Sequence, residues 1–290
     1  MLSIAPNIRG GDKLPSIRAD ADLVLVPVTV TDQRGASVTG LDRKHFTLLQ
    51  DNVPQNIVAF SQQNIRCSVG LIADTSGSMY HQLGALKSAV RAFLETAEAR
   101  DEASLMSVSD RPETHSDFTS EPVTLQNNVQ SIRPGGSTAL VDTLYLALSR
   151  MRSAHNPRRV LLVVSNGMDN HSRYSNSDLI RVAVEADVQI YTIAIGVAPR
   201  YKKPIQVQEE HNGRVLLEDL AERTGGLHFV VEYPSQVEQV AAKIGLALRN
   251  QYVIGYRPGE TEGSGKWHKI RVKLDVPKTN VYARNGYYSR

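Results

Sequence analysis

The chain has 290 residues, of which 41% are hydrophobic and 22% are charged, and its formal net charge is +3. This mixture is typical of a globular protein, and so small a net charge gives no reason to expect a nucleic-acid partner. No apolar run approaches the roughly 18 residues of a membrane span. The single cysteine, Cys67, excludes an internal disulfide and a zinc site built from cysteines.

The first part of the chain predicts a leader followed by short β-strands. Residues 1–20 are polar, rich in Gly and Pro and without an apolar segment, so we expect a poorly ordered leader and no signal peptide in this chain. Residues 23–31, LVLVPVTVT, are mostly β-branched and predict a strand, which Pro27 favours at the edge of a sheet. Two further short strands are predicted at 46–50 and 57–60.

The pattern changes at Ser68 to strands that alternate with helices. SVGLIA is a continuous apolar run, which is typical of a strand buried on both faces of a parallel sheet. A helix is predicted at 82–99, where apolar residues recur on one face. Further strands are predicted at 103–109, 159–165, 188–196 and 227–232, and helices at 125–132, 139–151, 178–186, 216–226 and 237–250. The long connection at 197–214 is interpreted as a hairpin with a possible recognition role.

After Asn250 the β-pattern returns, with QYVIGYRP, a Gly-rich turn and WHKIRVKLDV. We predict that residues 21–65 and 250–290 pair into a small β-sandwich, because a lone hairpin at each end would be marginally stable. Residues 66–249 are predicted to form the domain inserted between them. Its fold class is α/β, a three-layer, doubly wound and mainly parallel sheet.

Oxygen-bearing side chains follow the first buried strand at alternating positions. Asp74, Ser76 and Ser78 can turn one carboxylate and two hydroxyls toward one point, and Gly77 allows a tight turn between the serines. Such hard oxygen ligands suit Mg²⁺ or Mn²⁺, with Ca²⁺ as a further alternative. Taken alone the motif is weak, since serines are common at helix starts.

Two later loops strengthen this metal-site hypothesis. GGST places Thr138 just before a helix, and RVLLVVS leads directly into Asn166 and Gly167. Loops that follow parallel strands lie along the same edge of the sheet, where ligands bind. We therefore expect these loops to converge with the Asp74 loop.

The motifs DTSGSM, GGSTAL and VLLVVSNG resemble the metal-ion-dependent adhesion site of von Willebrand factor A domains, over about residues 66–249. The flanking segments are similar to a bacterial, acidobacterial-type subfamily. The resemblance implies a metal held by Asp74, Ser76, Ser78 and Thr138, partly through water, with one position open for a carboxylate of a protein partner. It also implies an extracytoplasmic location: secreted, periplasmic or surface-associated.

One departure bears on this reading, because Asn166 stands where the family usually has Asp. An amide oxygen can still ligate a metal or hold a water, but the site loses a negative charge, which weakens metal binding and strengthens the pull on an acidic ligand. Asp169 could restore that charge from a second shell. Asp142 is expected to support a helix N-terminus, and the role of Asp110 stays open. A site that binds no metal is the alternative.

An enzyme is the less favoured hypothesis. A phosphoryl-accepting Asp74 would need a second carboxylate two residues on, where Ser76 stands. His81 has no visible orienting partner, and the G-x-S-x-G, Walker A and dinucleotide-binding patterns are missing. We predict a binding module, with a metal-free scaffold that binds through loops or β-edges as the second hypothesis.

Overall fold

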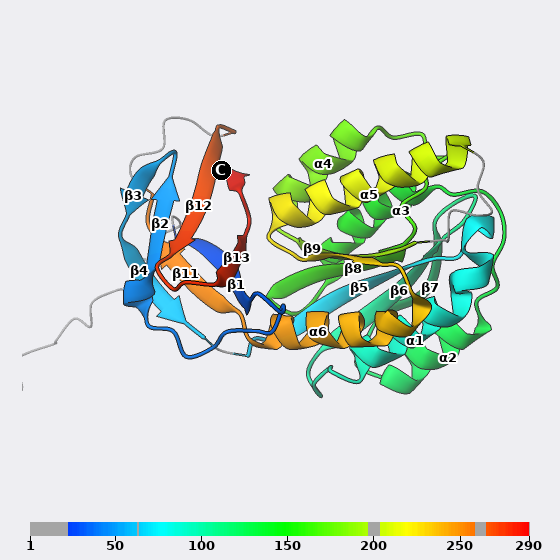
Figure 1. The fold of residues 1–290 in the computed structure, drawn as a ribbon, viewed down its shortest axis with the longest axis horizontal. Helices are drawn as coiled ribbons and strands as arrows, with labels where there is room; N and C mark the ends of the chain where they lie inside the picture. Colours follow the sequence, from blue (N-terminus) through cyan, green and yellow to red (C-terminus); the bar gives the residue numbers. More distant parts are fainter. Residues whose placement is uncertain (1–22, 63, 197–203, 259–264, 290) are drawn as a thin grey trace, which may run out of the picture.

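The computed structural model describes residues 23–62, 64–196, 204–258 and 265–289. The chain forms two lobes that lie side by side, a β-sandwich and an α/β lobe (Figure 1). The predicted leader, 1–20, lies outside the described residues. None of the described helices has the length and hydropathy of a membrane span.

The α/β lobe is built on a six-stranded sheet of order β10-β9-β8-β5-β6-β7. All neighbouring strands are parallel except β7, which runs antiparallel to β6. The strands are β5 (Cys67–Asp74), β6 (Glu102–Val108), β7 (Glu113–Thr119), β8 (Arg158–Ser165), β9 (Gln189–Ile195) and β10 (His228–Val231).

Helices cover both faces of this sheet, which gives the three predicted layers (Figure 1). One face packs against α1 (Leu83–Leu94), α2 (Pro122–Ser131) and α6 (Val237–Arg249). The other packs against α3 (Leu140–Arg150), α4 (Asn176–Glu185) and α5 (Pro204–Thr224). Every residue of β5 is buried, as expected for a strand covered on both sides. The predicted α/β fold class is confirmed.

The β-sandwich takes strands from both ends of the chain. Its sheets have the orders β13-β1-β11-β4 and β14-β12-β2-β3. The strands are β1 (Val24–Asp32), β2 (Phe46–Gln50), β3 (Val53–Gln55), β4 (Ile57–Ser61), β11 (Tyr252–Tyr256), β12 (Trp267–Leu274), β13 (Thr279–Ala283) and β14 (Gly286–Tyr288). The core between the sheets includes Val26, Val28, Leu48 and Ile254. Neither set of strands could bury this core without the other.

Three local predictions were wrong. β1 is an inner strand, and Pro27 is tolerated there because β13 pairs with β1 only from Val28 onward. The segment interpreted as a hairpin is instead the first half of α5 from Pro204, while residues 197–203 lie outside the described part. The helix predicted at 82–99 ends at Leu94 and is preceded by a 3₁₀ turn, Gly77–Gln82.

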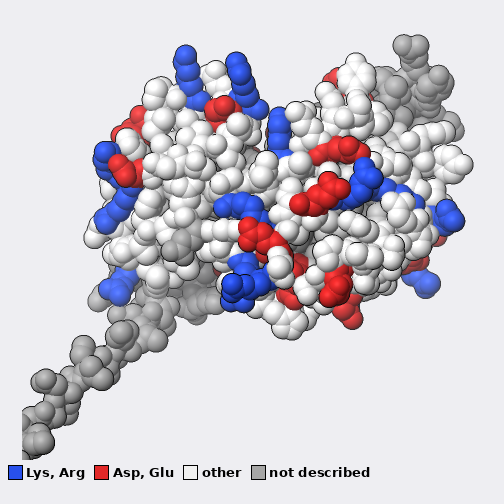
Figure 2. Space-filling view, turned by 90° about the horizontal axis from the view of Figure 1, so that it is seen from below, with Lys and Arg blue, Asp and Glu red and all other residues white. Residues whose placement is uncertain are grey.

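Figure 2 shows one face of both lobes, on which acidic and basic side chains are intermixed. An extended surface of one sign, such as nucleic-acid-binding proteins usually carry, is not present on this face.

Candidate metal centre

Asp74 is the last residue of β5 and its side chain is 0% exposed. One carboxylate oxygen accepts the backbone N–H of Ser76 at 3.0 Å, and the other accepts the hydroxyl of Ser165 at 2.5 Å. Burial raises the pKa of Asp74; the bonds from Ser165 and Ser76 oppose this, and the charge of Asp169 adds to it. None of these main influences is a positive charge, and no cationic side chain in the described part of the chain forms an ion pair with this carboxylate to offset its loss of hydration.

Two serine hydroxyls lie next to this carboxylate in the same loop. The Oγ atoms of Ser76 and Ser78 are 3.0 Å apart. Ser76 is buried, whereas Ser78 is partly exposed at the start of the 3₁₀ turn. The loop therefore presents a carboxylate and two neutral hydroxyl oxygens from the positions that the sequence predicted.

Residues 135–138 pack directly on this loop. The N–H of Gly77 donates to the carbonyl of Gly136 at 2.9 Å, and the N–H of Gly135 donates to the carbonyl of Thr75 at 2.8 Å. Thr138 is 2% exposed. Within the described ranges no group is hydrogen-bonded to its hydroxyl, which leaves this oxygen free to act as a ligand.

The third loop, at Asn166 and Gly167, meets the other two loops because β8 lies beside β5 in parallel register, with Val164 opposite Ala73. Asn166 is 1% exposed, and its side-chain amide donates to Ser78 Oγ at 2.9 Å. Its amide oxygen turns back to accept the N–H of Met168 at 3.0 Å. Direct ligation through this oxygen would require the amide to rotate, whereas holding Ser78 or a water would not.

The carboxylates of Asp169 and Asp142 mainly hold neighbouring segments together by accepting their backbone N–H groups. Asp169 accepts the N–H of Val141 at 2.7 Å in the first turn of α3, and it is close enough to raise the pKa of Asp74. Asp142, also in that turn, accepts the N–H groups of Arg173 and Tyr174. Burial alone would raise the pKa of Asp142, but these bonds hold it below its usual value.

Asp110 contacts the outer side of the second loop, residues 135–138. It accepts the N–H of Ser137 at 2.6 Å, and this bond lowers its pKa. Gly136, with φ of +77°, packs so closely that a Cβ atom would lie 2.8 Å from the Asp110 carboxylate. Asp110 therefore fixes the loop that carries Thr138.

Sequence reasoning missed two supports of the centre, Ser165 and Gly213. Ser165 binds Asp74 directly, and its position at the end of a buried strand was the available signal. Gly213 in α5 faces Gly167, so that a Cβ on Gly213 would lie 1.6 Å from the Gly167 carbonyl oxygen. The third loop therefore packs against the first half of α5, which the sequence did not predict to be helical.

The donor set fits a hard dication that keeps part of its water. Among the described residues no group of three or more His, Cys, Asp or Glu side chains could hold a metal ion, so a soft or multi-carboxylate site is not built here. One carboxylate, two or three hydroxyls and water are instead ligands that suit Mg²⁺ or Mn²⁺. No histidine within the described ranges hydrogen-bonds to the side chain of Ser76 or Ser78.

Comparison with known proteins finds similarity to one family of domains. Residues 69–168 match the model of the von Willebrand factor type A domain family. A search of curated proteins finds no match. The match covers part of the α/β lobe, which is similar to von Willebrand factor type A domains in sequence there and in fold. Membership of that family, and of the acidobacterial-type subfamily, stays a prediction.

Solved structures show the same fold at low identity. A von Willebrand factor type A protein from Catenulispora acidiphila is 11% identical over 92% of this chain and 73% of its own, with a TM-score of 0.54. Proximal thread matrix protein 1 from the mussel byssus, with a zinc-occupied MIDAS motif, is 13% identical over 70% and 50%, with a TM-score of 0.50. The vWF domain of the type V pili tip protein Mfa5 from Porphyromonas gingivalis is 13% identical over 69% and 99%, also at 0.50.

Proposed function

We propose that the α/β lobe is a metal-ion-dependent protein-binding or adhesion module. Mg²⁺ or Mn²⁺, or alternatively Ca²⁺, is held by Asp74, Ser76, Ser78 and Thr138 and coordinates an acidic side chain of a protein partner. The observation that carries this proposal is the fully buried Asp74 carboxylate, which lacks a cation at the meeting point of three oxygen-bearing loops. The zinc in the MIDAS motif of the mussel protein supports it by analogy.

Charge explains why an acidic partner is favoured. A dication bound to one carboxylate keeps a net charge of about +1, because the hydroxyl ligands are neutral. The negative charge of Asp169 is already engaged by backbone N–H groups of α3 and its own loop. A partner carboxylate would therefore both fill the open position and neutralise the remaining charge.

A metal-free scaffold is the second candidate, and one observation favours it. The side chains of the site already hydrogen-bond to one another. These bonds join Ser165 to Asp74, Ser76 to Ser78, and Asn166 to Ser78. Binding would then use exposed loops or the sheet edges at β4 and β13.

An extracytoplasmic location belongs to the same proposal. The similar structures include a pilus tip protein and a byssal thread protein, which their names place in assemblies outside the cell. We propose a secreted, periplasmic or surface-associated bacterial protein whose partner is another protein.

Calorimetric titration with Mn²⁺ tests the metal site. Wild type should bind one ion and Asp74→Ala should bind none. Asp42→Ala should bind like wild type, because Asp42 is exposed in the sandwich, where it pairs with Lys44. Absence of binding to wild type at millimolar Mn²⁺ would favour the metal-free scaffold.

Water-proton relaxation of the Mn²⁺-loaded protein tests the open position. Acetate should displace bound water and lower the relaxation enhancement, whereas neutral acetamide should not. An equal effect of the two compounds would contradict carboxylate coordination.

A further inference from the structure

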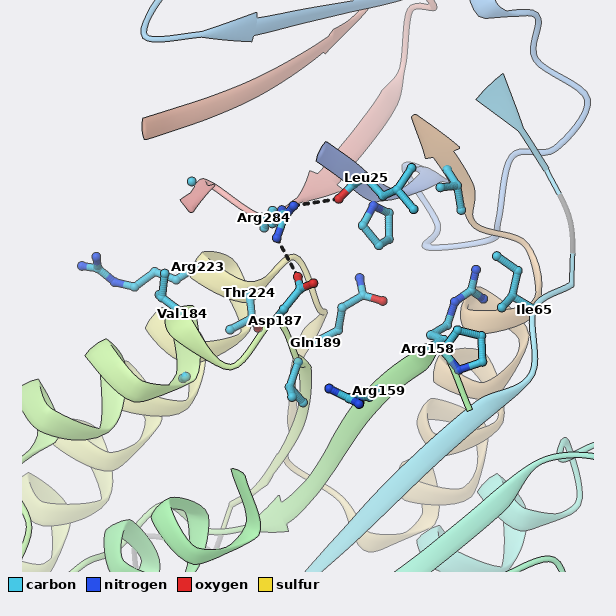
Figure 3. A pocket seen from close by; sticks show the side chains of 16 residues that line it. Leu25, Ile65, Arg158, Arg159, Val184, Asp187, Gln189, Arg223, Thr224 and Arg284 are labelled. Atoms are coloured by element: carbon cyan, nitrogen blue, oxygen red, sulfur yellow. Dashed lines mark hydrogen bonds and ion pairs between the residues drawn. The ribbon is translucent and has the colours of Figure 1, made fainter. Parts of the chain in front are cut away.

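A pocket of about 170 Å³ lies where the sandwich meets the amino ends of β8 and β9 (Figure 3). This is the edge of the central sheet opposite to the candidate metal centre, roughly 20 Å away along the eight-residue strand β8. A cavity of about 150 Å³ is large enough to hold a benzene molecule. The pocket can therefore take a ligand of that size, at a junction between lobes where ligands often bind.

The two lobes contribute different parts of this pocket. Leu25 and Val253 come from the sandwich, and Val188 precedes β9, so that part of the lining is apolar. The charged lining has four arginines and one aspartate, and Arg223 is already paired with Asp219 of its own helix, which leaves two positive charges in excess. The charged lining residues are Arg158, Arg159, Arg223, Arg284 and Asp187.

The single carboxylate is already engaged. Asp187 accepts Arg284 Nη1 at 2.6 Å, and the other terminal nitrogen of Arg284 donates to the Leu25 carbonyl at 2.7 Å (Figure 3). The side chain of Arg159 forms no ion pair or hydrogen bond with any described residue. Acceptors for the remaining arginine donors are therefore in short supply.

Arg158 shows this shortage most clearly. It is 6% exposed and donates Nη1 to the Leu248 carbonyl at the end of α6, but its Nη2 has no hydrogen-bond partner. The Nε atom of Arg284 is also buried and without a partner. A buried guanidinium nitrogen without an acceptor is costly, and an anionic oxygen is the acceptor that compensates it best.

We propose that this pocket binds a small organic carboxylate with an apolar body about as large as a benzene ring. The Arg158 guanidinium at the start of β8, whose Nη2 has no acceptor, binds the carboxylate, and the apolar residues from both lobes cover the body. This site is separate from the proposed metal site and does not depend on it. Inorganic phosphate would meet the same arginines but would leave the apolar lining unused.

Benzoate is a suitable probe, with benzamide as its neutral isostere. In calorimetric titration at constant ionic strength, benzoate should bind at least tenfold more tightly than benzamide and than inorganic phosphate. Equal binding of benzoate and benzamide, equal binding of benzoate and phosphate, or no binding of benzoate would each overturn the proposal. This comparison uses the wild-type chain and does not depend on any variant being folded.

A pair of variants locates the site. Arg158→Gln should weaken benzoate binding at least tenfold, whereas Arg152→Gln, a nearby exposed arginine outside this pocket, should leave it unchanged. Equal losses in both variants would point to a general charge effect and overturn the assignment. Benzoate binding should persist in EDTA and in Asp74→Ala, so that failure of the metal proposal and failure of this one are distinguishable.

Discussion

Buried aspartates lie at both edges of the central sheet, and two of them, Asp101 and Asp74, have different kinds of partner. Asp101, just before β6, is 6% exposed, accepts the N–H groups of Cys67 and Glu98 at 2.8 Å each, and forms an ion pair with Arg249. Asp74, at the carboxyl end of β5, is more deeply buried, and its partners among the described residues are the neutral hydroxyls of Ser165 and Ser76 and one backbone N–H.

The metal-site proposal rests on this difference. A buried carboxylate is tolerated when a charge or several donors offset its loss of hydration. Asp101 meets that condition within the chain, because Arg249 of α6 supplies the charge. The partners of Asp74 are neutral, and a dication from solution would supply the missing charge.

The largest expected effect comes from removing the internal cation of Asp101. Arg249→Ala should lower the free energy of unfolding by about 3–5 kcal/mol, because it leaves a buried carboxylate unpaired. Urea unfolding monitored by circular dichroism measures the loss. The matched control is Arg91→Ala, whose ion pair with Glu238 is exposed and should be worth less than about 1 kcal/mol. Similar losses in both variants would show that Asp101 does not need its partner.

Adding a charge to the metal site should have the next largest effect. Asn166→Asp should tighten Mn²⁺ binding about tenfold, because a second carboxylate offsets more of the cost of dehydrating the ion. Without metal the same variant should melt at a lower temperature than wild type, since two carboxylates then share one buried site. Calorimetry and thermal unfolding in EDTA check the two effects. Unchanged affinity would mean that position 166 does not face the ion.

The smallest effect is expected at Asp51 in the sandwich, whose carboxylate is half exposed. A hydrogen bond from His268 and the N–H of Lys269 lower its pKa. Because the folded-state pKa lies below the unfolded value, its stabilisation is present at neutral pH and is lost as pH falls below about 4. Asp51→Asn should cost less than about 1 kcal/mol at pH 7, owing to solvent screening, and nothing near pH 2. A cost that does not vary with pH would contradict this assignment.

Much of the fold could be predicted because its signals are local. The apolar run of β5 and the alternation of strands and helices require a covered, mainly parallel sheet. β7 was missed because ETHSDFT is polar and pairs only as an antiparallel edge strand. The first half of α5 was missed because its contact with the third loop, through Gly213 and Gly167, is a tertiary one.

The site was predictable in its residue types but not in its orientations. The spacing of Asp74, Ser76 and Ser78 indicated one cluster of oxygens, and the parallel topology indicated which loops would meet it. The direction of the Asn166 amide depends on Met168 and Ser78, which come from different loops. Tertiary packing sets this side-chain orientation, and a single sequence does not reveal it.

Thermal unfolding of wild type and Asp74→Asn, in EDTA and in Mn²⁺, tests the central claim most directly. In EDTA the variant should melt no lower than wild type, because it replaces a buried carboxylate that has no cation. At a Mn²⁺ concentration 100 times the Kd, wild type should gain about 2.7 kcal/mol of stability and the variant almost none. An equal gain in both proteins, or no gain in wild type, would contradict a cation held by Asp74.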